Sequence, residues 1–185
     1  MALSKKKEQE YIEMVRKNPS FLKEIKTQTE EICLEAVKKD GLALYYVKKQ
    51  TEKICLEAVK KEGLVLRNVE KQTPEICLEA VRQNGLALNH VKEQTEELCL
   101  EAIKQNGEAL EYVKDQSEEI CLEAVKQQGW ALNYVENQTK EMDLINRSLR
   151  HYKLESYREI RSRLASGEME PKDSPYHVLE QLNAY

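Results

Sequence analysis

A 22-residue period runs through most of the chain and limits what it can fold into. The segments 29–50 and 51–72 are identical at 16 of 22 positions, and five such segments fill 29–138 of the 185 residues. A repeat this short cannot bury its own hydrophobic face, so we expect the repeats to stack into a solenoid. The period is marked by two residue types: Cys33, Cys55, Cys77, Cys99 and Cys121, and Gly41, Gly63, Gly85, Gly107 and Gly129.

Each repeat is predicted to form two short helices. The first opens on a residue that can act as an N-cap, with Pro74 at the first helical position of one repeat. The first helix should run to the glycine, which we expect to adopt the left-handed conformation that ends many helices. A second helix of about two turns should follow, for example over residues 42–48. The predicted N-caps are Thr29, Thr51, Thr73, Thr95 and Ser117.

Helical periodicity predicts which side chains each helix buries. In the first helix the apolar arc is wide enough for contact on two sides, and it contains Ile32, Cys33, Leu34, Ala36 and Val37. In the second helix the stripe is Ala43, Leu44 and Val47, while Tyr45, Lys48 and Lys49 point away. The predicted fold is therefore all-α, a right-handed α-solenoid of tandem 22-residue helical hairpins with a C-terminal helical cap.

The ends depart from the repeat in the way that solenoid caps do. Residues 1–28 are predicted to be a degenerate N-terminal capping repeat, and 29–138 the five regular repeats. A different helical seam over 139–167, which includes Met142 and Ile145, is predicted to be the C-terminal cap. Residues 168–185 are expected to be a linker and a short last helix.

The repeats resemble a known family in two segments, AVRQNGLALNHV (80–91) and AIKQNGEALEYV (102–113). These are similar to the tandem helical-hairpin repeat called domain of unknown function 4116. The resemblance covers 29–138, and 7–28 more weakly. It implies a repeat scaffold without established chemistry, so no catalytic residue follows from it. The family is abundant in giant viruses and in microbes that share their hosts, which suggests a viral, phage or pathogen origin.

Charge and composition exclude several classes of function. The formal charge is -4, and it is graded: 14 basic and 10 acidic residues in 1–61, 7 and 15 in 62–139, and 8 and 8 in 140–185. This balance argues against a dedicated nucleic-acid binder. No apolar run approaches the length of a membrane span, and the charged N-terminus does not resemble a secretory signal. We expect an intracellular, cytoplasmic protein with no membrane partner.

The residues that most resemble a chemical site have simpler structural roles. The cysteines are too far apart along the chain for zinc or disulfide geometry and should be buried as small hydrophobes. The glutamates at 35, 57, 79, 101 and 123 each precede a basic residue by three positions, the spacing of surface ion pairs. No nucleotide-binding or catalytic motif is present. We therefore expect no enzyme activity, no metal site and no cofactor.

The positions that vary between repeats are the candidate binding surface. After each glycine, three slots of the second helix change from repeat to repeat and should stack into a variable ridge, with Trp130 as its best anchor. The alternative is that the ridge packs on the first helix of the preceding repeat, above all through Tyr46, Tyr112 and Tyr134. The candidate ridge residues are Leu42, Tyr45, Leu64, Arg67, Leu86, Asn89, His90, Glu108, Glu111, Trp130 and Asn133. A second candidate is the C-terminal tail, with Tyr176, Leu179 and Leu182.

The sequence favours a non-enzymatic scaffold that binds a protein partner through the ridge, the tail or both. Given the resemblance, that partner is expected to be a host factor in the host cell cytoplasm. The alternative is a role tied to nucleic acid, by repeat-wise reading of RNA or by acidic mimicry of a nucleic-acid backbone. The third hypothesis is an enzyme. Its candidate residues are limited to His151, Tyr157 and the arginines of 158–163. Self-association is left open.

Overall fold

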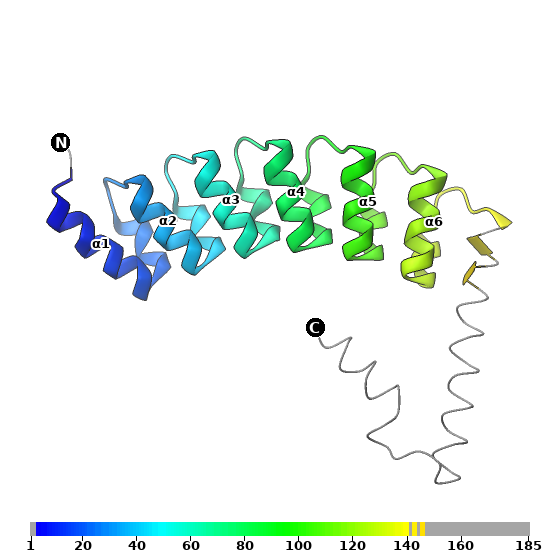
Figure 1. Ribbon diagram of the computed structural model, residues 1–185, viewed down its shortest axis with the longest axis horizontal. Coiled ribbons are helices and arrows are strands. Elements are labelled where there is room, and N and C mark those ends of the chain that lie inside the picture. Colours follow the sequence, from blue (N-terminus) through cyan, green and yellow to red (C-terminus); the bar gives the residue numbers. More distant parts are fainter. Residues whose placement is uncertain (1–2, 141, 144, 147–185) are drawn as a thin grey trace, which may run out of the picture. The chain divides into compact units, whose positions relative to one another are not determined.

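The computed structural model describes residues 3–140, 142–143 and 145–146. The chain divides into two compact units, Met1–Asn137 and Gln138–Tyr185. In the described part every regular element is a helix, and strands are absent. Figure 1 shows the α-helices of the first unit side by side in chain order. In the first unit, six α-helices alternate with six short 3₁₀ helices, and neighbouring helices touch in chain order. The protein is an α-solenoid, as predicted.

The elements recur at the spacing of the sequence repeat. The α-helices are α1 (Lys5–Lys17), α2 (Glu30–Lys39), α3 (Glu52–Lys61), α4 (Pro74–Gln83), α5 (Glu96–Gln105) and α6 (Glu118–Gln127). The 3₁₀ helices are η1 (Pro19–Glu24), η2 (Gly41–Tyr46), η3 (Gly63–Asn68), η4 (Gly85–His90), η5 (Gly107–Tyr112) and η6 (Gly129–Tyr134). From η1 to η5, each 3₁₀ helix contacts the α-helix before it and the α-helix after it. The 3₁₀ helices therefore fill the junctions between successive α-helices.

The α-helices begin where the sequence predicts. The hydroxyls of the predicted Thr and Ser N-caps accept hydrogen bonds from the backbone N–H three residues on, at 3.3–3.4 Å. Pro74 occupies the first turn of α4 without losing a hydrogen bond, because the first N–H groups of a helix have no intrahelical partner. Ser4 caps α1 in the same way, through the N–H of Lys7 at 3.3 Å.

The second element of each repeat differs from the prediction of a two-turn α-helix. It is a six-residue 3₁₀ helix that ends at Tyr46 in the repeat 29–50 instead of continuing to Lys48. In four of the six cases its start is fixed by an Asx cap, in which Asp or Asn accepts a bond from the N–H two residues on. Asp40, for example, accepts from the Leu42 N–H at 3.0 Å.

The predicted left-handed conformation of the glycines is wrong. The α-helix ends instead at an extended residue, such as Asp40 with φ -148°, and Gly41, Gly63, Gly85 and Gly107 all lack a positive φ. Glycine is required by close approach. A Cβ on Gly41 would stand 2.7 Å from the Ala58 carbonyl oxygen of α3, in the next repeat, and one on Gly85 would clash with the Ala102 carbonyl oxygen.

The core is continuous along the first unit and consists of the predicted residues. Ile32, Cys33, Leu34, Ala36 and Val37 are buried in α2, and the equivalent Ile or Leu, Cys, Ala and Val or Ile are buried in α3 to α6. The predicted stripe of the second element, Ala43, Leu44 and Val47, is also buried. Tyr45, Lys48 and Lys49 are exposed, as expected. This burial supplies the stability that an isolated 22-residue repeat lacks.

The N-terminal repeat is polar on its outside. The buried side chains of this repeat are Ile12 and Val15 in α1, Leu22 in η1, and Ile25 directly after η1. The solvent-facing residues of α1 are almost all polar, with Met14 as its exposed apolar side chain. Such a surface limits end-to-end growth of a solenoid.

The second compact unit is described only at its beginning. Thr139 accepts a hydrogen bond from the Met142 N–H at 3.4 Å, so the N-cap of the repeat recurs here. Met142 and Asn146 are buried. The rest of the predicted C-terminal cap and the tail lie outside the described residues. Within the described residues, no helix combines the length and the apolar character needed to cross a membrane.

Candidate functional site

The 3₁₀ geometry sorts the variable positions into columns. Side chains three residues apart are eclipsed in a 3₁₀ helix, so each element presents three columns instead of a helical spiral. In η2 the first column, Gly41 and Leu44, is buried. In the second column Ala43 is buried and Tyr46 is half-buried. The third column, Leu42 and Tyr45, faces solvent. The same order of columns recurs at each 22-residue step, although Gly129 in the inward column of η6 is half-buried.

The outward columns of η2 to η6 together form one surface, here called the outer ridge. Successive 3₁₀ helices contact one another from η1 to η6, which places these columns side by side. Leu42 is 50% exposed, Tyr45 72% and Trp130 38%, so each of these large side chains presents apolar surface to solvent. Arg67, Asn89, Glu111 and Asn133 are exposed as well, whereas Leu64, Leu86 and Glu108 are half-buried. The outer ridge is Leu42, Tyr45, Leu64, Arg67, Leu86, Asn89, Glu108, Glu111, Trp130 and Asn133.

The third predicted slot of the variable ridge lies in a different column. Tyr46, Asn68, His90, Tyr112 and Tyr134 are all half-buried. The partial burial of these five residues agrees better with a packed position than with an exposed ridge. Burial, together with the positive charge of Arg67, lowers the pKa of His90 below its ordinary value. His90 therefore sits at the edge of the outer ridge, with its imidazole favoured in the neutral form.

Aromatic pairs stand at both ends of the outer ridge. Tyr45 and Tyr46 meet edge to face, with ring centroids 5.3 Å apart. Trp130 and Tyr134 do the same at 5.8 Å. Partial burial and the negative charges of Glu111 and Glu108 raise the pKa of Tyr134. The C-terminal end of the ridge thus combines an exposed indole with two carboxylates, whereas its N-terminal half is mainly apolar.

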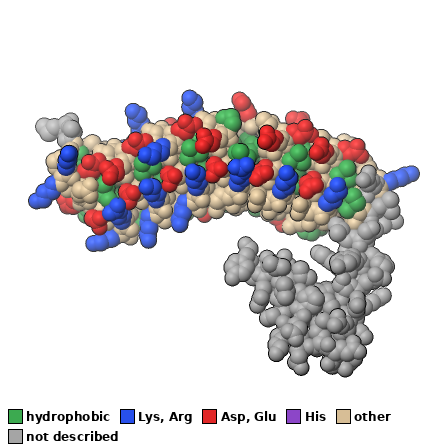
Figure 2. All heavy atoms as spheres, in the orientation of Figure 1, with side chains coloured by type: hydrophobic (Ala, Val, Ile, Leu, Met, Phe, Trp, Pro, Cys, Tyr) green, Lys and Arg blue, Asp and Glu red, His purple; other side chains and the backbone are tan. Residues whose placement is uncertain are grey.

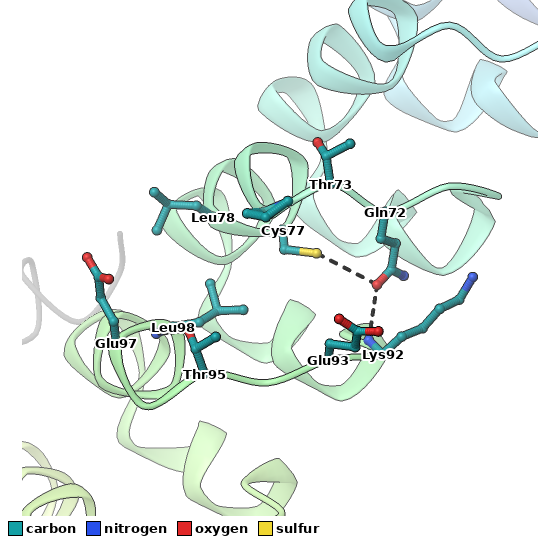
Figure 3. A pocket seen from close by; sticks show the side chains of 10 residues that line it. Gln72, Thr73, Cys77, Leu78, Lys92, Glu93, Thr95, Glu97 and Leu98 are labelled. Atoms are coloured by element: carbon teal, nitrogen blue, oxygen red, sulfur yellow. Dashed lines mark hydrogen bonds between the residues drawn. The ribbon is translucent and has the colours of Figure 1, made fainter.

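A ladder of glutamines joins successive repeats, and the sequence analysis did not identify it. Gln72 reaches from the end of one repeat into the next, where its Nε2 donates to the His90 carbonyl oxygen at 2.8 Å. Its Oε1 accepts from the Lys92 N–H at 3.0 Å (Figure 3). Both partners lie where η4 has just ended and the backbone has no helical partner. The same bonds recur at each step. The members of this glutamine ladder are Gln28, Gln50, Gln72, Gln94 and Gln116.

The cysteines belong to the same network. All five are free and buried, as predicted. Each thiol points to the Oε1 of the glutamine five residues earlier, for example Cys55 Sγ to Gln50 Oε1 at 3.5 Å. Burial raises the pKa of Cys33 and of Cys55 to about 11, with nearby glutamates adding to the effect. Burial also raises the pKa of Cys77, Cys99 and Cys121. These thiols are hydrogen-bond donors in the core and poor nucleophiles.

Two of the five predicted ion pairs form on the outside of the α-helices in the described part of the chain. Glu35 pairs with Lys38 at 3.5 Å, and Glu79 with Arg82 at 3.7 Å. Arg82 also reaches Glu101 of the next repeat at 3.3 Å. On the face shown in Figure 2, basic and acidic side chains are interspersed along the row of helices, with apolar side chains between them. Exposed pairs of this kind contribute little to stability, about 0–1 kcal/mol each.

The remaining candidates give no chemical site within the described residues. In that part of the chain, no group of three or more His, Cys, Asp or Glu side chains is placed to hold a metal ion. Tyr176, Leu179 and Leu182 of the predicted tail, and His151, Tyr157 and the arginines of 158–163, lie outside the described residues.

Comparison with known families supports the repeat assignment. The family described as Domain of unknown function (DUF4116) matches residues 29–73, 51–95, 73–117 and 95–140. The chain belongs to this family. A search of curated proteins and a search of solved structures each found no match.

The DUF4116 matches fit the structure repeat by repeat. Successive matches begin at Thr29, Thr51, Thr73 and Thr95, which are the N-caps of α2 to α5. Each match extends across two α-helices and the 3₁₀ helix that contacts both. The DUF4116 segment therefore corresponds to a pair of adjacent repeats with the junction between them.

Proposed function

We propose that the chain is a non-enzymatic scaffold that binds a protein partner through the outer ridge. The observation that carries this proposal is the contrast within each 3₁₀ helix. The inward column repeats the same apolar residues, while the outward column changes at every step and leaves Leu42, Tyr45 and Trp130 in solvent. Large exposed aromatic side chains on a rigid support are typical anchors of protein interfaces.

The chemistry of the outer ridge supports a proposal for the kind of partner. Its first three steps each begin with leucine, at Leu42, Leu64 and Leu86, so the matching part of the partner should be apolar. Its fourth and fifth steps bring Glu108 and Glu111 beside the aromatic pair of Trp130 and Tyr134. Carboxylates next to an indole favour a lysine or arginine side chain, through ion pairing and cation–π contact. We therefore infer a partner segment that is apolar at one end and basic at the other.

The cellular setting is a narrower proposal. The partner is a host factor, and the protein acts in the host cell cytoplasm as the product of a virus, a phage or a pathogen. Its support is the family membership. RNA reading by the repeats has less support, because the outer ridge contains one basic residue, Arg67, against two acidic ones.

A capture experiment with matched variants tests the proposal. The wild-type chain, a Tyr45→Ala/Trp130→Ala variant and a Met14→Ala variant are used as baits in lysate of the organism in which the protein acts. Met14 on α1 is 38% exposed, like Trp130, but lies outside the outer ridge. A captured protein is then purified, and its affinity for each bait is measured by calorimetry.

The expected result is a partner that binds wild type and Met14→Ala alike and loses at least about tenfold in affinity, or about 1.4 kcal/mol, with the ridge variant. A chain truncated after Gly167 separates ridge from tail. A partner that requires only residues 168–185 places binding in the tail, and a partner that all baits bind equally contradicts the ridge proposal.

A further inference from the structure

A second surface of the solenoid lies at the N-terminal ends of the α-helices, away from the outer ridge. Three grooves open there, one at each of three successive repeat junctions, with volumes of about 200, 300 and 520 Å³. They are lined by residues 50–73, 72–98 and 94–136 and are named here by these ranges. The groove linings use equivalent positions 22 residues apart, including the ladder glutamine, the N-cap and the cysteine. The grooves therefore repeat in step with the α-helices.

The 72–98 groove has an apolar floor and an acidic rim. Pro74, Cys77 and Leu78 of α4 and Leu98 of α5 line it, and Figure 3 shows Leu98 projecting into the space between the two helices. Glu93 and Glu97 stand at its rim and are exposed. The side chain of Lys92 extends away from the groove in Figure 3, and its Nζ donates to the Glu70 carbonyl oxygen at 3.1 Å.

The neighbouring groove is more acidic. Glu96, Asp115 and Glu136 line the 94–136 groove, against one basic residue, Lys114. The Nζ of Lys114 donates to the Lys92 carbonyl oxygen at 2.9 Å. Counted over all three grooves, seven carboxylates face three lysines. Among the described residues, none of these seven carboxylates forms an ion pair with a lysine or arginine side chain.

All three grooves combine a buried cysteine with rim carboxylates, and the 72–98 groove adds the apolar side chains of Pro74, Leu78 and Leu98. This combination of apolar surface and negative charge matches the lysine side chain. Its four-carbon stem packs on apolar surface, while its ammonium group stays near solvent and negative charge. A lone apolar side chain would leave the rim unpaired, and a short polar cation would leave the floor uncovered. The charge of the surrounding segment, 7 basic against 15 acidic residues over 62–139, favours the same class of ligand.

The grooves follow adjacent α-helices, so the step between them is expected to equal the usual spacing of packed helices. Packed helices are separated by about 8–10 Å. A polyproline II segment rises about 3.1 Å per residue with three residues per turn, so every third side chain points the same way at steps of about 9 Å. In a β-strand, residues three apart point to opposite faces and would not enter successive grooves.

We propose that the three grooves bind an extended polypeptide in the polyproline II conformation with a lysine at every third position. Each lysine stem occupies one groove, and its ammonium group pairs with the rim carboxylates. This surface shares no residue with the outer ridge, so it is a binding site additional to the proposed one.

The probe is a fluorescent twelve-residue peptide, (Lys-Pro-Pro)4, titrated with the full chain and followed by anisotropy. The matched control peptide is (Lys-Lys-Pro-Pro-Pro-Pro)2, which has the same composition and charge but a different lysine spacing. The spaced peptide should bind wild type at least about fivefold more tightly than the clustered peptide, which corresponds to about 1 kcal/mol. Equal affinity for both peptides, or no binding of the spaced peptide at millimolar protein, overturns the proposal.

Two charge-matched variants locate the site. The groove variant carries Glu93→Gln, Glu97→Gln and Asp115→Asn, all at exposed positions of the rims. The control variant carries Glu31→Gln, Glu75→Gln and Glu118→Gln, which remove the same charge from first-turn positions outside the three grooves. The spacing preference should disappear in the groove variant and persist in the control variant.

If the groove variant keeps the spacing preference, the site is elsewhere and the inference is wrong. The Tyr45→Ala/Trp130→Ala variant should bind the spaced peptide as wild type does, which separates this surface from the outer ridge. Circular dichroism of each variant confirms that the solenoid is intact.

Discussion

The inward and outward columns of the 3₁₀ helices stand on the same short elements and obey different rules. The inward column, with Gly85 and Leu88 in η4, is buried and touches the next repeat. The outward column, with Leu86 and Asn89 in η4, is half-buried or exposed. Residues that touch a neighbouring repeat must fit it, so they recur, whereas residues in solvent are free to vary. In this solenoid, the regularity of the inside is what allows an irregular surface outside.

The largest expected effect is at an inward glycine. Gly85→Val should destabilise the chain by more than about 3 kcal/mol, because its Cβ would clash with the backbone carbonyl of Ala102, which cannot move without shifting α5. Urea unfolding followed by circular dichroism measures the change, and a split transition would show that the junction has uncoupled. The control is Leu86→Val in the outward column, expected to change stability little. A neutral Gly85→Val would remove the case for close approach.

The glutamine ladder should come next in size. Gln94→Leu keeps most of the side-chain volume but leaves the Tyr112 carbonyl and the Lys114 N–H without the bonds made at 2.8 and 3.0 Å. We expect a loss of about 2–3 kcal/mol in the free energy of unfolding. Gln105→Leu, at an exposed position near the end of α5, is the matched control. Equal effects of the two substitutions would show that the ladder is not a stabilising contact.

The buried thiols should resist chemical modification. Because the pKa of Cys33 and Cys55 is raised from 9.0 to about 11, their thiolate fraction at pH 8 is about a hundredfold lower than that of an ordinary thiol. Labelling of the native protein should be at least that much slower than labelling of the urea-unfolded chain, read by mass spectrometry. Rapid native labelling of either cysteine would contradict its burial.

The same shift predicts a loss of stability in alkali. A thiol whose pKa is raised on folding stabilises the native state fully below the unfolded pKa of 9.0, and this contribution is lost as the pH rises through about 11. The free energy of unfolding of wild type should therefore fall more steeply between pH 9 and 11 than that of a Cys33→Ala/Cys55→Ala variant. Identical slopes would indicate that both thiols titrate alike in the folded and unfolded chains.

The residue before each 3₁₀ helix is a site at which a substitution should raise the stability of the chain by a smaller amount. η3 and η6 lack the side-chain cap that Asp or Asn supplies to η1, η2, η4 and η5. Glu62→Asn should add this cap to η3 and raise stability by about 0.5–1 kcal/mol. The reverse change, Asn84→Ala, removes the bond to the Leu86 N–H at 3.0 Å and should cost a similar amount. Thermal melts of the two variants should shift in opposite directions.

The outward column should give the smallest effect on stability. Tyr45→Ser removes a side chain that is 72% exposed, so the free energy of unfolding should change by less than about 0.5 kcal/mol. Urea unfolding beside Leu44→Ala, its fully buried neighbour, makes the comparison direct. A loss with Tyr45→Ser approaching the several kcal/mol expected for Leu44→Ala would mean that the outer ridge is part of the core.

Local sequence rules predicted the α-helices well because their determinants are local. A hydroxyl three residues before its N–H partner, a proline in a first turn and an apolar arc all lie within one helix, and Thr73, Pro74 and Val81 occupy the expected places. The second helix was less predictable. These six-residue elements are 3₁₀ helices with an Asx cap, as in η2, and without one, as in η3, so the local cap does not decide the helix type.

For the candidate site, the sequence located the variable positions but not their sorting. Helical periodicity placed Leu42, Tyr45 and Tyr46 on adjacent rows, whereas the 3₁₀ helix stacks Leu42 with Tyr45 and turns Tyr46 partly inward. Gln72 was overlooked because its partners are 18 and 20 residues further on, in another repeat. A polar residue that recurs at every step while its neighbours change is the signal that could have found it.

The amino-acid sequence by itself determined that the repeats stack, because a 22-residue repeat with apolar arcs on both helices can bury those side chains only against another repeat. It also determined where each α-helix begins and which residues form the core. Only the tertiary structure shows why a glycine recurs at this position and how successive repeats are joined. Both depend on atoms of the next repeat, the Ala102 carbonyl against Gly85 and the backbone beyond η4 against Gln72, and such contacts exist only once two repeats have packed.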